Sequence, residues 1–229
     1  MTDLFLTNNY PETSKVRSKK KALTRQKLIL AALHLVGEGK SFTALGIREI
    51  TREAGVVPTA FYRHFRNTDE LGLALVEEGG RSLRRLLRRA RQTSQPGTLM
   101  IRHSVHVFIN YLKENHLEWR FVAMERSGGA KILRMAIRNE ITHFTNEMVS
   151  DLRALGVFPD MRTPIYQHIC GIVVTLMMHS VTDFLDLNPG DPKVEKEMID
   201  HFVRQITVVF LGGARWQLRA KKFSFKRSV

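Results

Sequence analysis

The segment of residues 46–65 constrains the fold of this chain more than any other. In its first half, Ile47, Ile50 and Ala54 have the spacing that places apolar side chains on one face of a helix. Gly55 follows, and glycine readily adopts the left-handed backbone conformation that ends many helices. Pro58 stands where a new helix can begin, because the first helical residue needs no N–H. The segment therefore predicts two short helices joined by a tight turn.

The second of these helices is predicted to have an apolar inner side and a polar outer side. Phe61 and Phe65 are spaced i, i+4 and are expected to face the core. The other side chains offer hydroxyl, methyl, phenol, guanidinium and imidazole groups, which suit base edges and phosphates. They are Thr59, Ala60, Tyr62, Arg63 and His64. Two such helices form a helix-turn-helix, whose second helix lies in the major groove of DNA.

The same segment carries a family resemblance. Residues 61–71 read FYRHFRNTDEL and resemble the signature of TetR-family repressors, and the preceding GIREITREAGVVPTA is similar to the family's second and third helices. Within the family, EAGVVPTAFYRHFRNTDELGLALVEE resembles the FabR and DesT type, the regulators of unsaturated fatty-acid synthesis, as does MERSGG at residues 124–129. The resemblance implies an all-α fold. It consists of an N-terminal three-helix helix-turn-helix DNA-binding domain and a larger helical ligand-binding and dimerisation domain.

Residue roles at the DNA follow partly from this resemblance. Tyr62 and His64 match positions that contact the phosphate backbone in the family, and they are assigned that role here. Thr59, Ala60 and Arg63 are the candidates for base reading, since a methyl group suits thymine and a guanidinium suits guanine.

Three further residues are candidates for contacts beside the groove. Thr43 and Arg48 are expected to touch phosphates, although plain solvent exposure would explain them equally well. At Thr68 many family members carry a lysine, and a threonine hydroxyl can still bond a phosphate oxygen.

Composition agrees with a DNA-binding function. The formal net charge of +14 and the pI near 10.3 favour a polyanionic partner such as DNA, RNA, or an acidic protein or membrane surface. The single cysteine, Cys170, excludes an intramolecular disulfide and a cysteine-based zinc site, and suits a reducing compartment. No signal peptide is visible, and the longest apolar run, residues 169–178, is shorter than the roughly 20 residues that span a bilayer. We therefore expect a cytoplasmic protein that does not bind a membrane.

The chain is predicted to have four parts. They are a basic disordered arm at residues 1–21, the helix-turn-helix domain at 22–67, the helical ligand-binding and dimerisation domain at 68–222 and a basic tail at 223–229. Apolar periodicity predicts helices near residues 24–37, 68–91, 98–114, 117–127, 130–155, 163–186 and 192–220. Thr68 is expected to cap the second of these, and Gly79 and Gly80 to bend it.

The last two predicted helices are the expected homodimer interface. Residues 167–184 are apolar on more than one side, which predicts burial all round. The pair Gly212 and Gly213 would permit close helix contact. One short recognition helix reads too few base pairs, whereas a two-fold dimer reads both halves of a palindromic operator. The resemblance implies the same arrangement, a four-helix bundle across a two-fold axis.

A ligand pocket in the helical domain is implied mainly by the resemblance. Regulators of the FabR and DesT type respond to long-chain acyl thioesters of coenzyme A or acyl carrier protein, which need a deep apolar tunnel with cations at its mouth. The candidate lining residues are Phe108, Trp119, Phe121, Met124, Phe144, Met148 and Met177, with Arg126 nearby. These side chains would equally suit a plain core. An unrelated hydrophobic ligand such as a drug, or control by a protein partner, are the alternatives.

An arginine-rich stretch, RSLRRLLRRAR, supplies candidate anion-binding groups. The stretch contains no acid, whereas exposed helix faces usually alternate charge signs. The candidates are Arg81, Arg84, Arg85 and Arg88. They would receive coenzyme A phosphates, an acidic carrier protein or the DNA backbone; a solvated helix face is the alternative.

Nothing in the sequence indicates an enzyme. There is no serine elbow, P-loop or GxGxxG motif, and the pairs His179/Asp183 and His143/Glu147 each lack a visible third metal ligand. We therefore expect no catalytic residue, no metal and no cofactor. A nucleoid-type DNA-binding protein would share the charge but would not need the large helical C-terminal half.

Overall fold

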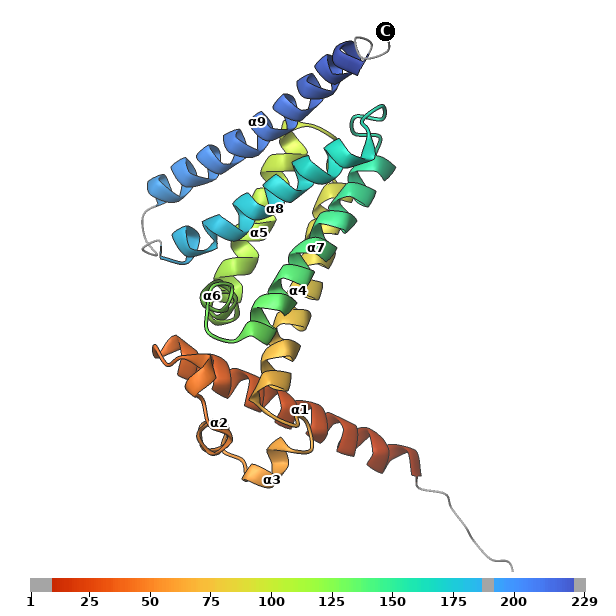
Figure 1. The fold of residues 1–229 in the computed structure, drawn as a ribbon. Helices are drawn as coiled ribbons and strands as arrows, with labels where there is room; N and C mark the ends of the chain where they lie inside the picture. The colour runs from red at the N-terminus through yellow and green to blue at the C-terminus, as the bar shows by residue number, and fades with distance from the viewer. Residues whose placement is uncertain (1–9, 187–191, 225–229) are drawn as a thin grey trace, which may run out of the picture. The chain divides into compact units, whose positions relative to one another are not determined.

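The computed structural model describes residues 10–186 and 192–224, and every regular element in these ranges is helical (Figure 1), as predicted. The chain divides into two compact units after Gly72. This boundary falls within α4 (Thr68–Gln92), so that one helix belongs to both units. The sequence had placed the division between residues 67 and 68.

The N-terminal unit is a three-helix domain around a small core. It contains α1 (Tyr10–Gly37), a 3-10 turn (Phe42–Ala44), α2 (Ile47–Glu53), α3 (Pro58–Phe61) and the first residues of α4. Phe61 and Phe65, which were predicted to face inward, are 0% and 3% exposed. They share the core with the fully or almost fully buried side chains of Leu28, Ala32, Phe42, Ile50 and Leu71.

The first helix begins earlier than predicted. The sequence indicated a disordered arm at residues 1–21 and a helix from residue 24, but α1 begins at Tyr10, and the prediction is wrong for residues 10–21. The segment has no apolar stripe, yet lysine and arginine are good helix formers, so the core-anchored helix extends through it, with residues 16–21 exposed. Residues 1–9 and 225–229 lie outside the described residues. The helix α9 (Pro192–Ser224) includes the first residues of the predicted basic tail.

The C-terminal unit consists of long helices whose ends lie close to those predicted. After α4 come α5 (Thr98–Glu114), α6 (His116–Glu125), α7 (Lys131–Ala154), α8 (Thr163–Leu185) and α9. The helix α8 packs against α5, α6, α7 and α9 and forms the centre of the unit. Phe202 on α9 lies 6.4 Å from Phe108 on α5 and 6.0 Å from Phe184 on α8, measured between ring centroids. Three helices thus share one aromatic cluster.

Glycines allow close helix contact at three positions. A Cβ at Gly79 or Gly80 would collide with the carboxylate of Glu118 or Glu140, respectively. We expected these two glycines to bend α4. The structure gives them a different role, because their missing side chains leave room for Glu118 of α6 and Glu140 of α7. At Gly213 a Cβ would collide with Ile169, which confirms close contact between α9 and α8 at this glycine. At Gly212 the same Cβ would meet open space in the single chain, so there the expected contact stays a prediction.

Two expectations for α8 need correction. The apolar run at residues 169–178 belongs to a 23-residue helix, so length and composition alone would permit α8 to cross a membrane. It is the one such helix among the described residues, and it is partly buried as the core helix of its unit. Burial is also not complete, because Ile172 is 50% exposed. This apolar side chain on the outer side of α8 is uncovered in the single chain.

Candidate DNA-binding surface and ligand cavities

The turn between α2 and α3 is built from local hydrogen bonds. Gly55 has a φ of 65°, which an L side chain rarely adopts, and its N–H donates to the carbonyl of Arg52 over 3.1 Å. The N–H of Val56 donates to the carbonyl of Thr51 over 2.9 Å. Pro58 is the first residue of α3, as predicted. The turn fixes the direction in which α3 leaves α2, and α3 carries the candidate base-reading residues.

The structure places the predicted DNA-contacting residues mainly at the surface. Five of them are exposed and three are half-buried. The exposed residues are Thr43, Arg48, Thr59, Tyr62 and Arg63, and the half-buried ones are Ala60, His64 and Thr68. Residues 59–64 come together on α3 and the turn after it, while Thr43 lies in the 3-10 turn and Arg48 on α2.

A basic group surrounds His64. Partial burial, followed by the positive charges of Lys21, Arg25 and Arg63, lowers the pKa of His64 below its usual value of 6.5. The Arg25 guanidinium lies 5.2 Å from the centroid of the Phe65 ring. Sequence reasoning missed Lys21 and Arg25 as partners of α3, because they come from α1 and nothing in the local pattern links the two helices.

The cap of α4 differs from the one predicted. The Asn67 side-chain oxygen accepts a hydrogen bond from the Glu70 N–H over 2.9 Å, and the Glu70 carboxylate accepts one from the Arg66 N–H over 2.6 Å. Asn67 therefore caps the helix, and Thr68 is its first residue. The Thr68 hydroxyl is thus not needed for capping.

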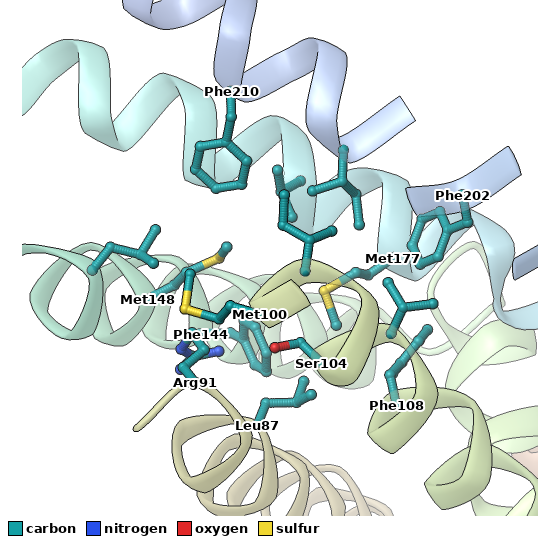
Figure 2. A pocket seen from close by; sticks show the side chains of 15 residues that line it. Leu87, Arg91, Met100, Ser104, Phe108, Phe144, Met148, Met177, Phe202 and Phe210 are labelled. Carbon is teal, nitrogen blue, oxygen red and sulfur yellow. The ribbon is translucent and has the colours of Figure 1, made fainter. Parts of the chain in front are cut away.

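The C-terminal unit contains two narrow apolar cavities of about 40 Å³ each. The first is lined by α4, α5, α7, α8 and α9 (Figure 2) and the second by α4, α5, α6, α7 and α8. Phe108, Phe144 and Met177 line both cavities and so separate them. Met148 lines the first cavity and Trp119 the second. These five were candidate ligand-binding residues in the sequence.

The other three candidates lie elsewhere. Phe121 is 0% exposed but lines neither cavity, so it is a core side chain. Met124 is 44% exposed, and neither it nor Arg126 lines either cavity. Phe121 and Met124 lie on α6 and Arg126 directly follows it, and periodicity could not show that they lie outside the cavity walls.

Polar groups in the cavity walls were not anticipated. Arg91 and Ser104 are lining residues of the first cavity and Trp119 of the second, and the polar atoms concerned are the Arg91 Nε, the Ser104 hydroxyl and the Trp119 indole nitrogen. All three atoms are buried and lack a hydrogen-bond partner within the part of the chain that the structure describes. Buried polar groups ordinarily have hydrogen-bond partners. These three are therefore candidates for hydrogen bonds to a ligand in the otherwise apolar cavities.

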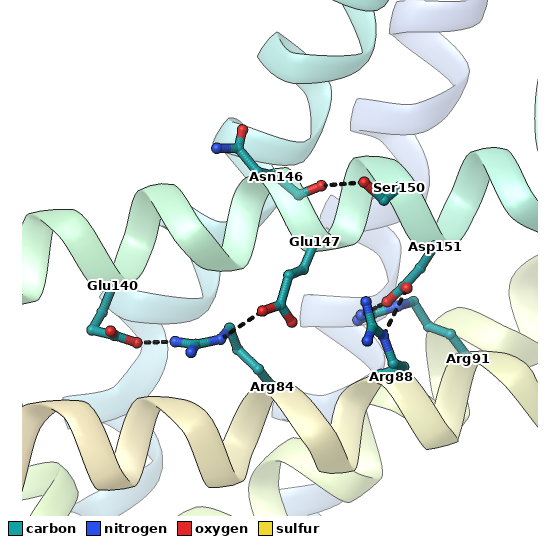
Figure 3. Close-up of polar contacts among 8 residues, drawn as sticks. All are labelled: Arg84, Arg88, Arg91, Glu140, Asn146, Glu147, Ser150 and Asp151. Atoms are coloured by element: carbon teal, nitrogen blue, oxygen red, sulfur yellow. Dashed lines mark hydrogen bonds and ion pairs between the residues drawn. The ribbon is translucent and has the colours of Figure 1, made fainter.

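The arginine-rich face of α4 is paired with acids from α7 (Figure 3). Arg84 bonds Glu140 and, over 3.1 Å, Glu147. Arg88 and Arg91 both bond Asp151, over 2.9 Å and 2.5 Å.

These pairs show that three of the four arginines predicted to bind anions already have acidic partners. Arg84 bonds two carboxylates and Arg88 shares Asp151 with Arg91, all some 60 residues away in the chain, while Arg81 bonds Glu77 on its own helix. Arg85 is exposed, and no ion pair is found for it among the described residues.

The sequence of the N-terminal unit identifies its family. Residues 28–75 match the family model described as bacterial regulatory proteins, tetR family. The chain is a TetR-family transcriptional regulator. It belongs to a family of DNA-binding proteins, not of enzymes, and among the described residues no group of three or more potential metal ligands is found.

Solved structures share the fold of this TetR-family regulator. The fatty acid degradation regulator FadR from Bacillus halodurans is 17% identical, with a TM-score of 0.63, covering 83% of this chain and 95% of that one. A transcriptional regulator from Aquifex aeolicus is 13% identical with a TM-score of 0.61, covering 80% and 95%. The regulator PfmR from Thermus thermophilus is 16% identical with a TM-score of 0.57, covering 79% and 96%. At these identities the likeness establishes the fold alone.

Proposed function

We propose that this TetR-family regulator is a cytoplasmic repressor that binds a palindromic operator as a homodimer and responds to a small apolar ligand. The observation that carries the proposal is the surface of α3. Thr59 is exposed on α3, whose direction is fixed by the Gly55 turn, and Arg63 is exposed in the turn after it, with Phe61 and Phe65 anchored in the core. Base-reading groups on a rigidly held helix are what a major-groove reader requires.

An uncovered apolar face supports the dimer. Ile172 on α8 is 50% exposed, and on α9 the exposed fractions are 67% for Val208, 62% for Leu211 and 67% for Trp216. A groove of about 460 Å³ lies between these helices and is lined by Ile172, Val208 and Trp216 among others. An apolar face of this kind is typical of a protein interface, and it belongs to the two helices expected to pair.

A long acyl chain is the ligand that we propose, carried as a thioester of coenzyme A or acyl carrier protein. Its support is the resemblance to the FabR and DesT type, the fold shared with a fatty acid degradation regulator, and the two cavities lined by phenylalanine and methionine. Methionine adapts to alkyl chains of different shape. The genes controlled would then be those of fatty-acid metabolism, unsaturated fatty acids above all. At about 40 Å³ each, the cavities must open for such a ligand to enter.

The proposed coupling runs through α4. This helix lines both cavities with Val76, Leu83 and Leu87, and its first residues belong to the DNA-binding unit. A ligand that binds one position of α4 more tightly than another shifts the population of recognition-helix separations, and only one separation matches the operator.

The first test is fluorescence anisotropy with an operator from the genomic neighbourhood of the gene. Titrations without ligand, with saturated and with unsaturated acyl-coenzyme A should give different affinities. Tight binding that ignores both acyl types would leave the operator-binding regulator and remove the acyl ligand, in favour of a different hydrophobic molecule or a protein partner.

A matched pair of variants tests the DNA surface. Arg63→Ala should lower operator affinity about tenfold or more and weaken the preference for operator over random DNA, because a base-reading arginine contributes about 1–3 kcal/mol. Arg138→Ala removes the same charge from an exposed position on α7 and should change affinity little. Equal losses in the two variants would show that Arg63 acts only through charge.

A further inference from the structure

Two hydrogen-bond donors in the wall of the first cavity have no partner in the described part of the chain. The Arg91 Nε–H and the Ser104 hydroxyl are both buried, on α4 and α5. Helix serines often donate to a carbonyl of their own helix, as Ser150 on α7 does to Asn146 over 3.0 Å. Ser104 does not, and Figure 2 shows its hydroxyl directed toward the side of the cavity where Arg91 lies. An apolar space with two unused donors is built to receive an acceptor.

The charge around this cavity wall is positive. Asp151 is shared by two arginines, Arg88 and Arg91, so this group of three carries one excess positive charge. Arg91 and Asp151 are each 6% exposed, whereas Arg88 is 46% exposed, so solvent screens the charge of this group least at its Arg91 end. Farther along the same helices the balance is reversed, because Arg84 faces both Glu140 and Glu147. An anionic group is favoured at the Arg91 end only.

The rest of the ligand volume is apolar. Phe108, Phe144 and Met177 line both cavities and form the wall between the first and the second. Rotation of the Phe144 and Met177 side chains would join the two cavities into one elongated space. Methionine has three rotatable bonds and makes such a rearrangement inexpensive.

We propose that Arg91 and Ser104 bind the carboxylate of an elongated apolar acid whose chain extends past Phe144 and Met177 into the second cavity. The two donors, the Arg91 Nε–H and the Ser104 O–H, match the two oxygens of one carboxylate. A phosphate would bring a larger charge and more acceptors than these donors and the single excess charge can satisfy. The anchor is buried, so it selects a compact head group. The inference rests on the proposed response of the C-terminal unit to an apolar ligand, and it names a free carboxylate as the head group in place of the thioester.

The test is direct binding of dodecanoate to the full-length protein without DNA, measured by isothermal titration calorimetry below the critical micelle concentration. Dodecyltrimethylammonium carries the same chain length with a cationic head that cannot accept a hydrogen bond, and it should bind at least tenfold more weakly. Dodecanoyl-coenzyme A, run in parallel, distinguishes a free carboxylate from a thioester carbonyl at the same donors.

Two variants locate the anchor. Ser104→Ala removes an unpartnered hydroxyl, so it should leave thermal unfolding unchanged and weaken dodecanoate binding about tenfold. Arg91→Lys retains a charge for Asp151 but loses the guanidinium Nε, and should weaken binding similarly. Ser180→Ala is the matched control, since its half-buried hydroxyl donates to the Met177 carbonyl on α8 and lines neither cavity.

The outcomes separate this proposal from the proposed function. Loss of dodecanoate affinity in Ser104→Ala but not in Ser180→Ala supports the anchor, even if operator binding ignores the ligand. Loss seen with dodecanoyl-coenzyme A alone assigns the acceptor to a thioester carbonyl and overturns the carboxylate. Equal binding of the anionic and cationic probes, or affinities unchanged in both anchor variants, overturns the anchor, whatever ligand the operator assay responds to.

Discussion

The two units of this regulator hold their functional side chains in opposite ways. In the N-terminal unit, exposed groups such as Arg63 stand on a helix of four residues or the turn after it, and bonds between near neighbours position that helix. In the C-terminal unit, buried groups such as Arg91 depend on partners about 60 residues away in the chain. The first arrangement can be altered one side chain at a time. In the second, each change leaves a partner buried and unpaired.

The largest effect is expected at Asp151, where the C-terminal unit depends most on a distant partner. Asp151→Ala leaves the buried Arg91 guanidinium without a counter-charge, and should lower the free energy of unfolding by about 3–5 kcal/mol in urea titration. Ser150→Ala, next to it on α7, loses only an exposed bond to the Asn146 carbonyl and should cost less than about 1 kcal/mol. Similar losses in both would show that the pair contributes little.

A buried carboxylate in the C-terminal unit should make stability depend on pH. Burial, and secondarily the charge of Glu78, raises the pKa of Glu118 to about 7 from 4.5. Between these values the folded state binds more protons than the unfolded state, so this contribution to stability is complete below pH 4.5 and is lost as pH rises to 7. Glu118→Gln should therefore raise the free energy of unfolding by about 2 kcal/mol at about pH 8.

At about pH 5 the same Glu118→Gln variant should differ little from the parent protein, because Glu118 is then mostly protonated in the folded state. Chemical denaturation at both pH values provides the comparison. A stability difference that is the same under the two conditions would contradict the assignment.

In the N-terminal unit the sensitive point is the turn, which depends on local backbone geometry. Gly55→Ala places a Cβ at a φ of 65° and should destabilise the unit by about 1 kcal/mol, visible as reduced thermal stability and weaker operator binding. Gly171→Ala, in the interior of α8 with only ordinary contact to Thr145, should have the opposite sign. If Gly55→Ala were neutral, the turn would not hold α3 in place.

The smallest effect is expected at His64 and concerns the pH dependence of DNA binding. Burial and the cations around it lower its pKa in the free protein, whereas an adjacent phosphate would raise it. The complex then binds more protons than the free protein, so operator affinity should rise as pH falls below 6.5. His64→Asn should reduce this slope in anisotropy titrations from about pH 7.5 to about pH 5.5. An unchanged slope would remove His64 from the phosphate contacts.

The sequence predicted the local features of both units well. The turn at Gly55, the buried Phe61 and Phe65 and the ends of the long helices follow from patterns within a few residues, and the structure has them. It predicted poorly what depends on distant contacts. The arginine-rich stretch of α4 contains no acid, because its acidic partners Glu140, Glu147 and Asp151 lie on α7. The cavity lined by Arg91 and Ser104 could not be predicted from the sequence at all.

Two errors were of a different kind. The lysine-rich segment before residue 22 has no apolar period, yet from Tyr10 onward it is part of the core-anchored α1. For α4 two adjacent residues can both cap a helix, and the hydrogen bond from Glu70 selects Asn67 over Thr68. The spacing of apolar residues indicates neither the N-terminal extension of α1 nor the capping residue of α4.

The burial of the Arg91–Asp151 pair has a practical consequence for handling the protein. Dissolved ions screen exposed charges within about a Debye length but barely reach a pair whose members are each 6% exposed. Contacts to DNA phosphates, in contrast, weaken by orders of magnitude between about 50 and 200 mM salt. A salt gradient should therefore strip bound nucleic acid during purification and leave the helical unit folded.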